Sequence, residues 1–470
     1  MKRHILAGAI CAAVVLAGAA GCAHLGPAGP PHPVVVVTES RKPQAEIAPD
    51  FIGFSYEKSS LSSPLFDAKN AGLVSLFRRL GPGVLRIGGN SVDRTLWDPT
   101  GPGLLKGMAA PADISRLARF LRAAGWRIIY GLNLGTAAPA AAAEEAAAAR
   151  AAFGALLVAF EIGNEPDLYH SNGLRPQDYS YEDFLREWKT DARIVSQRSP
   201  DATFAGPVTA SDLRRYAVPF SRDAQGLLSL LTQHYYRANG KLPTSTIRLL
   251  LSPDSQLSGM LGELALAARS ENLVLGFRLD EANSFFNGGA PHVSDTFASA
   301  LWAIDFLFQC ASAGATGVNF HGGGESPGYT PIADNGTSVR EVRPLYYGML
   351  IFSMAARGSM AGAAVNGGAD DSISAWAVSG RDHSLRLILM DSGASVTPIE
   401  IRVPSPYRSA SLLRLTSASL GAEQGTLLGG APIGPDGAWG AAKEEQAAVP
   451  DGRLTVMVKG PEAVLVVFRQ

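Results

Sequence analysis

The sequence is poor in cysteine, has almost no net charge and contains no continuous run of basic residues. Among its 470 residues are three cysteines and eight histidines, and 41 basic side chains nearly balance 42 acidic ones. A chain with this balance has no general attraction for nucleic acid or for acidic membranes. No group of cysteines and histidines has the spacing of metal ligands. We therefore expect no nucleic-acid partner, no metal ion and no cofactor.

Cysteine is also too scarce for a framework of disulfide bonds. Residues 1–22 combine a basic start with a short apolar stretch, which is typical of a secretion signal. Cleavage before Cys22, which removes residues 1–21, discards Cys11 and leaves Cys22 and Cys310. Cys310 lies in a long helical pattern, so we expect it in the core.

The end of the signal contains a candidate lipidation site. Ala19-Ala20-Gly21-Cys22 resembles a bacterial lipobox, which would make Cys22 the acylated first residue of a lipoprotein. The alternative is ordinary cleavage near this position. Residues 23–33 are rich in proline and glycine and predict a tether. We expect an exported protein, either periplasmic, membrane-anchored or extracellular, that contacts a membrane only through such a lipid.

The next three hundred residues alternate between short apolar runs and longer helical patterns, as βα units with a parallel sheet do. The strand-like runs are eight: 51–56, 83–89, 127–134, 157–162, 203–208, 230–236, 275–280 and 314–320. Eight such units in this length predict a closed (β/α)8 TIM barrel. No GxGxxG motif follows the first run, so an open dinucleotide-binding sheet fits less well.

Beyond Gly358 the pattern changes to short strands separated by turns. The strand-like runs are 373–378, 385–390, 399–403, 410–415, 454–458 and 464–468. This pattern predicts an all-β module, a sandwich, to which the apolar run at 34–38 adds a strand. We therefore divide the chain into a catalytic barrel at 46–350 and a β-sandwich formed by 34–45 together with 351–470.

Two glutamates lie at the ends of predicted barrel strands, where TIM barrels place their active sites. Glu165 follows the fourth run, and Glu281 follows the seventh. Glycoside hydrolysis needs one carboxylic acid that protonates the leaving oxygen and one ionised carboxylate that attacks or screens the sugar carbon. Asp280 is adjacent to Glu281, and spacing alone does not decide which of the two faces the mouth.

Other polar residues also gather at the ends of the strands. Asn90, Asn133 and Tyr236 are candidates for substrate binding, whereas His321 is either a pocket residue or a structural histidine at a tight turn. Tyr236 shares a strand face with His234, and it either donates to a nucleophilic carboxylate and keeps its pKa low or is satisfied by the backbone.

One buried ion pair is expected inside the barrel. A strand period of two places Glu161 on the same inward face as Glu165. An unpaired charge there would be very costly, and Arg86 in the second run is the candidate partner. The plain interpretation of the two residues is a structural ion pair.

Four motifs, in this order and spacing, resemble the β-glucuronidase and heparanase family of glycoside hydrolases. They are Leu85-Arg86-Ile87-Gly88-Gly89, Gly163-Asn164-Glu165-Pro166, His234-Tyr235-Tyr236, and Asp280-Glu281-Ala282-Asn283-Ser284 followed by Gly288-Gly289-Ala290-Pro291. The resemblance runs from about Val34 to the C-terminus. It implies a barrel with a sandwich built from both chain ends, Glu165 as acid/base and Glu281, rather than Asp280, as nucleophile.

The resemblance also implies how the substrate is recognised. The uronate carboxylate would be bound by backbone NH groups matching Asn287 and Gly288 and by tyrosines, one of which corresponds to Tyr329. The chain departs from the family at Phe286, preceded by Phe285, where members commonly carry a tyrosine. Losing a hydrogen bond to a charged group costs about 1.5 to 3 kcal/mol, so we expect weaker uronate selectivity.

Together these features predict an exported retaining β-glucuronidase that acts on glucuronate-containing glycans or glycosides by double displacement. Its two carboxyl groups should lie about 5 to 5.5 Å apart, and Asn164 should contact the sugar 2-hydroxyl. There are two alternatives. One is a retaining β-glycosidase of the same fold for a neutral sugar, and the other is a catalytically inactive carbohydrate-binding lipoprotein.

Overall fold

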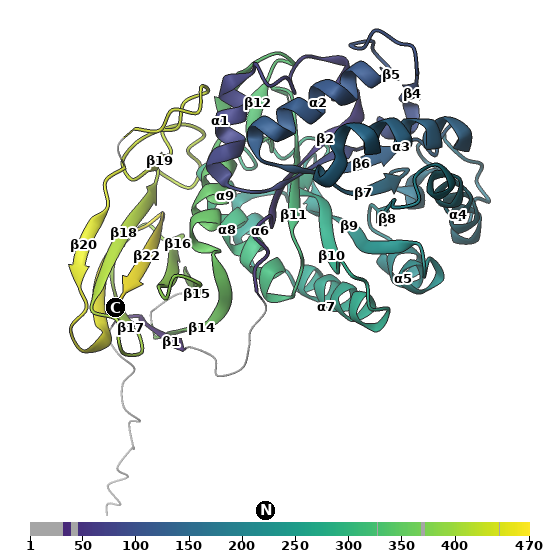
Figure 1. Cartoon of the computed structure of the whole chain (residues 1–470). Coiled ribbons are helices and arrows are strands. Elements are labelled where there is room, and N and C mark those ends of the chain that lie inside the picture. Colours follow the sequence, from purple (N-terminus) through teal and green to yellow (C-terminus); the bar gives the residue numbers. More distant parts are fainter. Residues whose placement is uncertain (1–31, 39–45, 327, 368–371, 441) are drawn as a thin grey trace, which may run out of the picture.

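Eight parallel strands close into a barrel, which confirms the predicted fold class. The computed structural model describes residues 32–38, 46–326, 328–367, 372–440 and 442–470. The predicted secretion signal, Cys22 and most of the predicted tether lie outside these residues. In barrel order the strands are β10 (Phe277–Phe286), β11 (Val318–Gly322), β2 (Ile52–Glu57), β3 (Val84–Gly88), β6 (Arg127–Leu132), β7 (Leu157–Ile162), β8 (Phe204–Thr209) and β9 (Leu228–Asn239) (Figure 1). Each predicted run overlaps one of them.

Helices cover the outside of the barrel. They are α1 (Ala71–Leu80), α2 (Pro111–Ala124), α3 (Pro139–Phe153), α4 (Tyr181–Arg198), α5 (Val218–Asp223), α6 (Ile247–Leu251), α7 (Ser255–Ser270), α8 (Phe297–Ser312) and α9 (Pro344–Ala355). Helix α1 shows why they pack there, because it buries Leu73, Leu76, Phe77 and Leu80 on one helical face. Among the described residues, no helix is long and apolar enough to cross a membrane.

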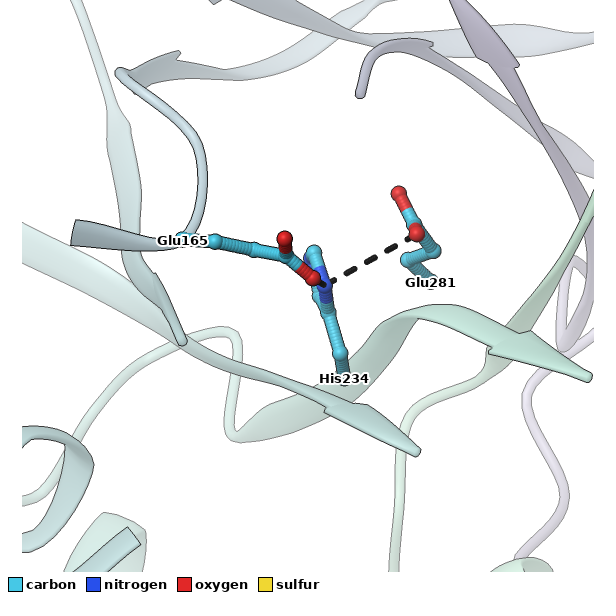
Figure 2. Close-up of side chains that lie close together, drawn as sticks. All are labelled: Glu165, His234 and Glu281. Carbon is cyan, nitrogen blue, oxygen red and sulfur yellow. Dashed lines mark hydrogen bonds and ion pairs between the residues drawn. The ribbon is translucent and has the colours of Figure 1, made fainter. Parts of the chain in front are cut away.

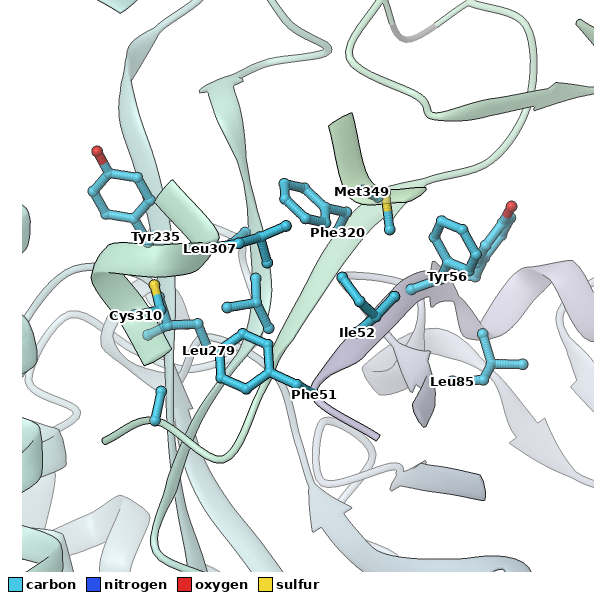
Figure 3. Close-up of a cluster of buried hydrophobic side chains, with 14 of the residues drawn as sticks. Phe51, Ile52, Tyr56, Leu85, Tyr235, Leu279, Leu307, Cys310, Phe320 and Met349 are labelled. Carbon is cyan, nitrogen blue, oxygen red and sulfur yellow. The ribbon is translucent and has the colours of Figure 1, made fainter. Parts of the chain in front are cut away.

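Helix α8 has no polar face, because it lies between the barrel and the second sheet. On one side Leu307 and Cys310 pack toward Leu279 and Phe320 of the barrel wall (Figure 3). On the other side Phe308 stacks on Trp376 of the second sheet, with ring centroids 5.6 Å apart. Cys310 is a free, fully buried thiol, as expected for a core residue.

The second sheet has ten strands and includes the N-terminal run. Its order is β19-β18-β22-β16-β15-β14-β1-β17-β21, and β20 pairs with β18. The strands are β1 (Val34–Thr38), β14 (Gly358–Asn366), β15 (Ile373–Gly380), β16 (Leu385–Asp391), β17 (Val396–Arg402), β18 (Ser409–Thr416), β19 (Leu427–Leu428), β20 (Glu445–Ala448), β21 (Arg453–Lys459) and β22 (Glu462–Arg469).

This sheet folds over to form the two layers of the predicted sandwich. Val35, Ile399 and Val456 from one arm share a hydrophobic core with Leu387 and Val466 from the other. Strand β1 joins the arms, since it pairs antiparallel with β14 and parallel with β17. The N-terminal run therefore completes a module that is otherwise C-terminal.

The loops that follow the barrel strands form the mouth. Two of them carry small two-stranded sheets, β4 (Leu96–Trp97) with β5 (Met108–Ala109) after β3, and β12 (Ile332–Asp334) with β13 (Val339–Val342) after β11. Active sites of TIM barrels are built from these loops and from the adjoining strand ends, so this face contains the candidate site.

Candidate active site

Glu165 lies three residues beyond β7 in a left-handed backbone conformation, with φ 51° and ψ 56°. Its backbone NH donates to the carbonyl oxygen of Val208, at 2.8 Å, and Val208 is itself left-handed with φ 63°. Such conformations are uncommon for residues other than glycine and cluster at functional sites. Here they aim the Glu165 side chain over the barrel mouth.

Glu281 faces Glu165 from strand β10, with His234 between them (Figure 2). One carboxylate oxygen of each glutamate and Nδ1 of His234 all lie within 4.8 Å of one another. His234 Nδ1 is 3.0 Å from Oε1 of Glu165 and 3.8 Å from Oε1 of Glu281. The structure thus brings together the two carboxylates that the sequence places 116 residues apart, 281 minus 165.

A β-bulge explains how Asp280 and Glu281 both lie on the inner side of the barrel. The register of β10 shifts between Arg278 and Glu281 against β9, and between Leu279 and Ala282 against β11. A bulge interrupts the alternation of side chains along a strand. Asp280 is consequently fully buried below the mouth, while Glu281 reaches the level of Glu165.

The surroundings of Glu281 favour its ionised form. Arg86 Nη1 donates to Oε2 at 2.6 Å, the Tyr236 hydroxyl donates to Oε1 at 2.8 Å, and His321 Nδ1 lies 3.4 Å from Oε2. Burial opposes ionisation, but His321, His234 and Arg86 outweigh it and hold the pKa of Glu281 well below its ordinary value. An ionised carboxylate of this kind suits a nucleophile.

Arg86 connects four strands at the floor of the site. Its Nε donates to Glu161 at 2.8 Å, its Nη1 also donates to Ser55 at 3.1 Å, and its Nη2 donates to Asn164 at 2.8 Å. The expected ion pair with Glu161 is therefore present. Because the same guanidinium also binds Glu281, the pair forms part of the site as well as of the barrel core.

Asp280 and His234 form a second charged contact below the mouth. Nε2 of His234 lies 3.7 Å from Oδ2 of Asp280, which is also 3.6 Å from Nε of Arg86. Burial alone would lower the pKa of His234, but Glu281, Asp280 and Glu165 outweigh it and raise this pKa well above its ordinary value. The surrounding carboxylates therefore favour the protonated imidazole.

Asn164 is fixed by bonds on three sides. Its backbone NH donates to Asp93 at 3.0 Å, its Oδ1 accepts from Arg86, and its Nδ2 donates to Asn90 at 3.3 Å. Sequence reasoning missed Asp93, which also accepts from the Tyr169 hydroxyl at 2.9 Å. Asp93 is buried in a short 3-10 turn after β3, and no motif in the sequence marks it.

The loop after β10 and Tyr329 form one wall of the mouth. Tyr329 lies beside Tyr236, with ring centroids 6.2 Å apart. Asn287 and Gly288 have φ of 64° and 87°, so the chain turns sharply there. A Cβ on Gly289 would lie 3.0 Å from the backbone nitrogen of Tyr329, so the loop packs against that segment. The predicted uronate-binding residues therefore border one surface.

The two phenylalanines beside this loop differ in position. Phe285 is fully buried, whereas Phe286 is 42% exposed and lies edge-on to Tyr236, with centroids 6.4 Å apart. Phe286 therefore presents an apolar ring to the mouth, and Phe285 belongs to the core.

The remaining candidates differ in their contacts. His321 lines the site, because its Nδ1 lies 3.1 Å from Oγ of Ser55 as well as close to Glu281. Asn133 lies in the loop after β6, where it accepts from the backbone NH of Thr136, and it donates to the backbone carbonyl of Thr95 in the loop after β3. Among the contacts between described residues, none joins Asn133 to Glu165 or Glu281.

The three central residues also have to be considered as metal ligands. In the described part of the chain, Glu165, His234 and Glu281 alone bring three potential ligand atoms within 4.8 Å. Arg86 donates to Glu281, so a guanidinium cation already contacts one of the three potential ligands. This cation opposes a divalent ion at this position, so the arrangement favours acid–base and nucleophilic chemistry.

A (β/α)8 barrel with paired carboxylates at the ends of its fourth and seventh strands has the fold and site of a glycoside hydrolase. No family model matches the chain. The sequence is 26% identical over 307 residues to a β-glucuronidase of Aspergillus niger, covering 57% of this chain and 57% of that protein. It is 24% identical over 372 residues to a β-glucuronidase of Neurospora crassa, covering 70% of this chain and 65% of that protein.

Solved structures share the fold over almost the whole chain. A 4-O-α-L-rhamnosyl-β-D-glucuronidase from Fusarium oxysporum 12S superposes with a TM-score of 0.76 at 19% identity, covering 92% of this chain and 99% of that one. An arabinofuranosidase from Xanthomonas axonopodis pv. citri gives 0.65 at 15% identity, covering 93% and 100%. The predicted resemblance to β-glucuronidases is thus confirmed, although the aligned regions span under two thirds of the curated relatives.

Proposed function

We propose that this protein is a retaining glycoside hydrolase that acts on β-glucuronides. The observation that carries the proposal is the short distance between the carboxylates of Glu165 and Glu281, which have oxygens within 4.8 Å of each other. Retaining enzymes need a separation of about 5 to 5.5 Å, whereas inverting enzymes leave about 6.5 to 9.5 Å for a water molecule. The close approach supports direct attack by a carboxylate.

In the first step, Glu281 attacks the anomeric carbon and forms an ester with the sugar. Glu165 gives its proton to the leaving oxygen as the glycosidic bond breaks. In the second step, Glu165 takes a proton from water, the water oxygen bonds to the anomeric carbon, and the ester bond to Glu281 breaks. Tyr236 and Arg86, which donate to Glu281, stabilise the ionised carboxylate before attack.

Asn164 is the proposed contact to the sugar 2-hydroxyl. Arg86 and Asn90 bind its amide from two sides, and its exposed fraction is only 2%. A side chain held this firmly presents a fixed hydrogen-bonding group beside the acid/base. A bond to the 2-hydroxyl that strengthens in the transition state contributes to catalysis.

Tyr329 and the NH groups of Asn287 and Gly288 are the proposed recognition elements for the uronate carboxylate. They border the wall of the mouth next to Tyr236, and the curated relatives are β-glucuronidases. Phe286 supports a second candidate, a β-glycosidase for a neutral sugar, because its ring offers no hydroxyl at this wall.

A panel of aryl β-glycosides tests these proposals. We expect release of phenol from the β-glucuronide at a higher kcat/KM than from the β-glucoside, β-galactoside or β-xyloside. Proton NMR should show the β-anomer of the sugar as the first product. Higher activity on a neutral glycoside would favour the second candidate. Binding of glycans with no phenol release from any substrate would favour an inactive carbohydrate-binding protein.

Export and lipidation of Cys22 form a separate proposal, which the basic start, the short apolar stretch and the lipobox-like sequence support. Mass spectrometry of the mature N-terminus tests it. A diacylglyceryl group on Cys22 that disappears in Cys22→Ser is the expected result. A free cysteine or a different first residue would indicate ordinary cleavage.

A further inference from the structure

Three buried side chains below the catalytic carboxylates have polar atoms that the proposed mechanism does not use. Asp280, Glu161 and His234 are each at most 1% exposed. Among the described residues, both carboxylate oxygens of Asp280, Oε1 of Glu161 and Nε2 of His234 have no hydrogen-bond partner. Buried polar groups rarely remain in this condition without a functional or electrostatic reason.

The buried residues around His234 must have nearly equal numbers of positive and negative charges. Arg86 and His234 supply two positive charges, and Arg86 contacts Glu161, Asp280 and Glu281. Burial raises the pKa of Glu161 to about 8, against the opposing effect of Arg86 and with the support of Asp280. With Glu161 protonated, the anions Asp280 and Glu281 balance the two cations, as a water-excluded site requires.

We infer that Asp280 is a positioning residue that keeps the His234 imidazole charged and holds it between the two catalytic carboxylates. This inference rests on the proposed function. The imidazole presents Nε2 to Asp280 at 3.7 Å on one side and Nδ1 to Glu165 and Glu281, at 3.0 and 3.8 Å, on the other. One fixed cation therefore serves both glutamates.

The fixed cation matches the movement of charge in double displacement. Before attack, Glu281 carries the negative charge and Glu165 carries a proton. Once the ester forms, Glu281 is neutral, and Glu165 is ionised because its proton has left with the alcohol. The charge has moved from one neighbour of His234 to the other, and the proton on the imidazole stays in place.

Several other charged or titratable groups surround His234 and Asp280. Arg86 from β3, Glu161 from β7, and Arg278 and Glu281 from β10 interact with one or both of them. Tyr236 and His321 contact Glu281, and Glu57 lies beyond His321. Arg278 is occupied one layer below, where it donates to Asn319 at 2.6 Å and to the backbone of Phe51 at 3.1 Å. A test must therefore change Asp280 alone.

Asp280→Asn provides this change with almost no change of shape. Glu165 must be protonated for glycosylation, so its proton sets the alkaline limb of the pH–rate profile of the first step. It must be ionised for deglycosylation, so the same proton sets the acidic limb of the pH–rate profile of the second step. Without the Asp280 anion the imidazole becomes neutral, and Glu165 then keeps its proton to higher pH. Both limbs should move upward by about one pH unit or more, because a charge at such short range shifts titration by about 1 to 3 units.

The direction of the movement decides the outcome. If Asp280 acted only as a nearby negative charge, its removal would favour the ionised form of Glu165 and move both limbs to lower pH. A downward movement, or none, would overturn the inference. Asp305→Asn is the matched control, because Asp305 is a partly buried acid of α8 that accepts from Trp376 at 2.9 Å, away from the site. Both limbs of the pH–rate profile of Asp305→Asn should match those of the wild type.

The wild-type protein permits a second test that does not depend on activity. Nitrogen-15 NMR of the imidazoles, with the His234 signal assigned by its loss in His234→Gln, should show both ring nitrogens still protonated at about pH 8. An ordinary histidine, with a pKa of about 6.5, is neutral at that pH. A neutral ring at that pH would overturn the inference. A charged ring in a protein that cleaves no glycoside would contradict the proposed function but not the state of His234.

Discussion

Arg86 Nη1 donates to Oε2 of Glu281 at 2.6 Å, and both side chains are almost completely buried. An isolated buried charge is very costly, but the same guanidinium also binds Glu161 and Asn164. The planar arrangement of its donors allows one residue to satisfy groups on β10, on β7 and in the loop after β7. The ionised state of Glu281 therefore depends on the geometry of the guanidinium as well as on its charge.

We predict that Arg86→Lys retains the fold but loses most of the activity. A lysine keeps the positive charge, but its compact ammonium cannot reach Glu161, Glu281 and Asn164 at once. Losing two bonds to charged or polar partners, at about 1.5 to 3 kcal/mol each, should lower kcat/KM by about 10² to 10⁴ fold. Steady-state kinetics with an aryl β-glucuronide measures this effect.

Arg127→Lys is the matched control for that substitution. Arg127 lies on barrel strand β6, but its side chain is 45% exposed and pairs with Asp50 at 3.1 Å. An exposed pair of this kind contributes little, so kcat/KM should remain within about twofold. An active Arg86→Lys enzyme would show that charge alone is sufficient.

We predict that Tyr236→Phe moves the acidic limb of kcat/KM to higher pH. The Tyr236 hydroxyl donates to Glu281 and helps to hold its pKa low. Without this bond the pKa of Glu281 rises, so protonation inactivates the nucleophile at a higher pH than in the wild type. Because a bond to a charged group is worth about 1.5 to 3 kcal/mol, kcat/KM should also fall about ten- to hundredfold.

Tyr346→Phe provides the comparison, since Tyr346 donates to the backbone of Leu76 in the core at 2.7 Å. This variant should lose some stability and keep the wild-type acidic limb. An acidic limb that stays in place in Tyr236→Phe would contradict the role given to the hydroxyl.

We predict that Phe286→Tyr increases selectivity for glucuronides. The Phe286 ring already lies at the mouth, next to Tyr236 and on the same wall as Tyr329. A hydroxyl there gains a bond to the uronate carboxylate worth about 1.5 to 3 kcal/mol, so the ratio of kcat/KM for glucuronide over glucoside should rise at least about tenfold. Phe286→Leu should leave the ratio unchanged or lower. An unchanged ratio in Phe286→Tyr would place the uronate elsewhere.

The sequence was sufficient to predict the barrel, the sandwich and the meeting of Glu165 and Glu281 at one end of the barrel. Strand-like runs recur regularly, and Glu165 and Glu281 lie in motifs at the strand ends. The choice between Asp280 and Glu281 could not be made by counting along the strand, because the bulge in β10 breaks the alternation on which such counting depends. The family resemblance selected Glu281, and the structure places Glu281 beside Glu165.

Residues that act through loops were harder to predict. Asp93 accepts bonds from the backbone of Leu134, Gly135 and Asn164, which follow two other strands. Asn133, predicted to bind substrate, instead links the loop after β6 to Thr95 in the loop after β3. Contacts between separate loops leave no periodic pattern in the sequence, since they depend on how the barrel brings the loops together.

Covalent labelling tests the central claim most directly. A 2-deoxy-2-fluoro-β-glucuronide with a good leaving group should inactivate the protein and remain attached as an ester, because the fluorine slows hydrolysis of the intermediate. Tandem mass spectrometry of the peptide containing Asp280 and Glu281 should find the sugar on Glu281. A sugar on Asp280, or full turnover of β-glucuronides with no ester at this peptide, would contradict the proposed mechanism.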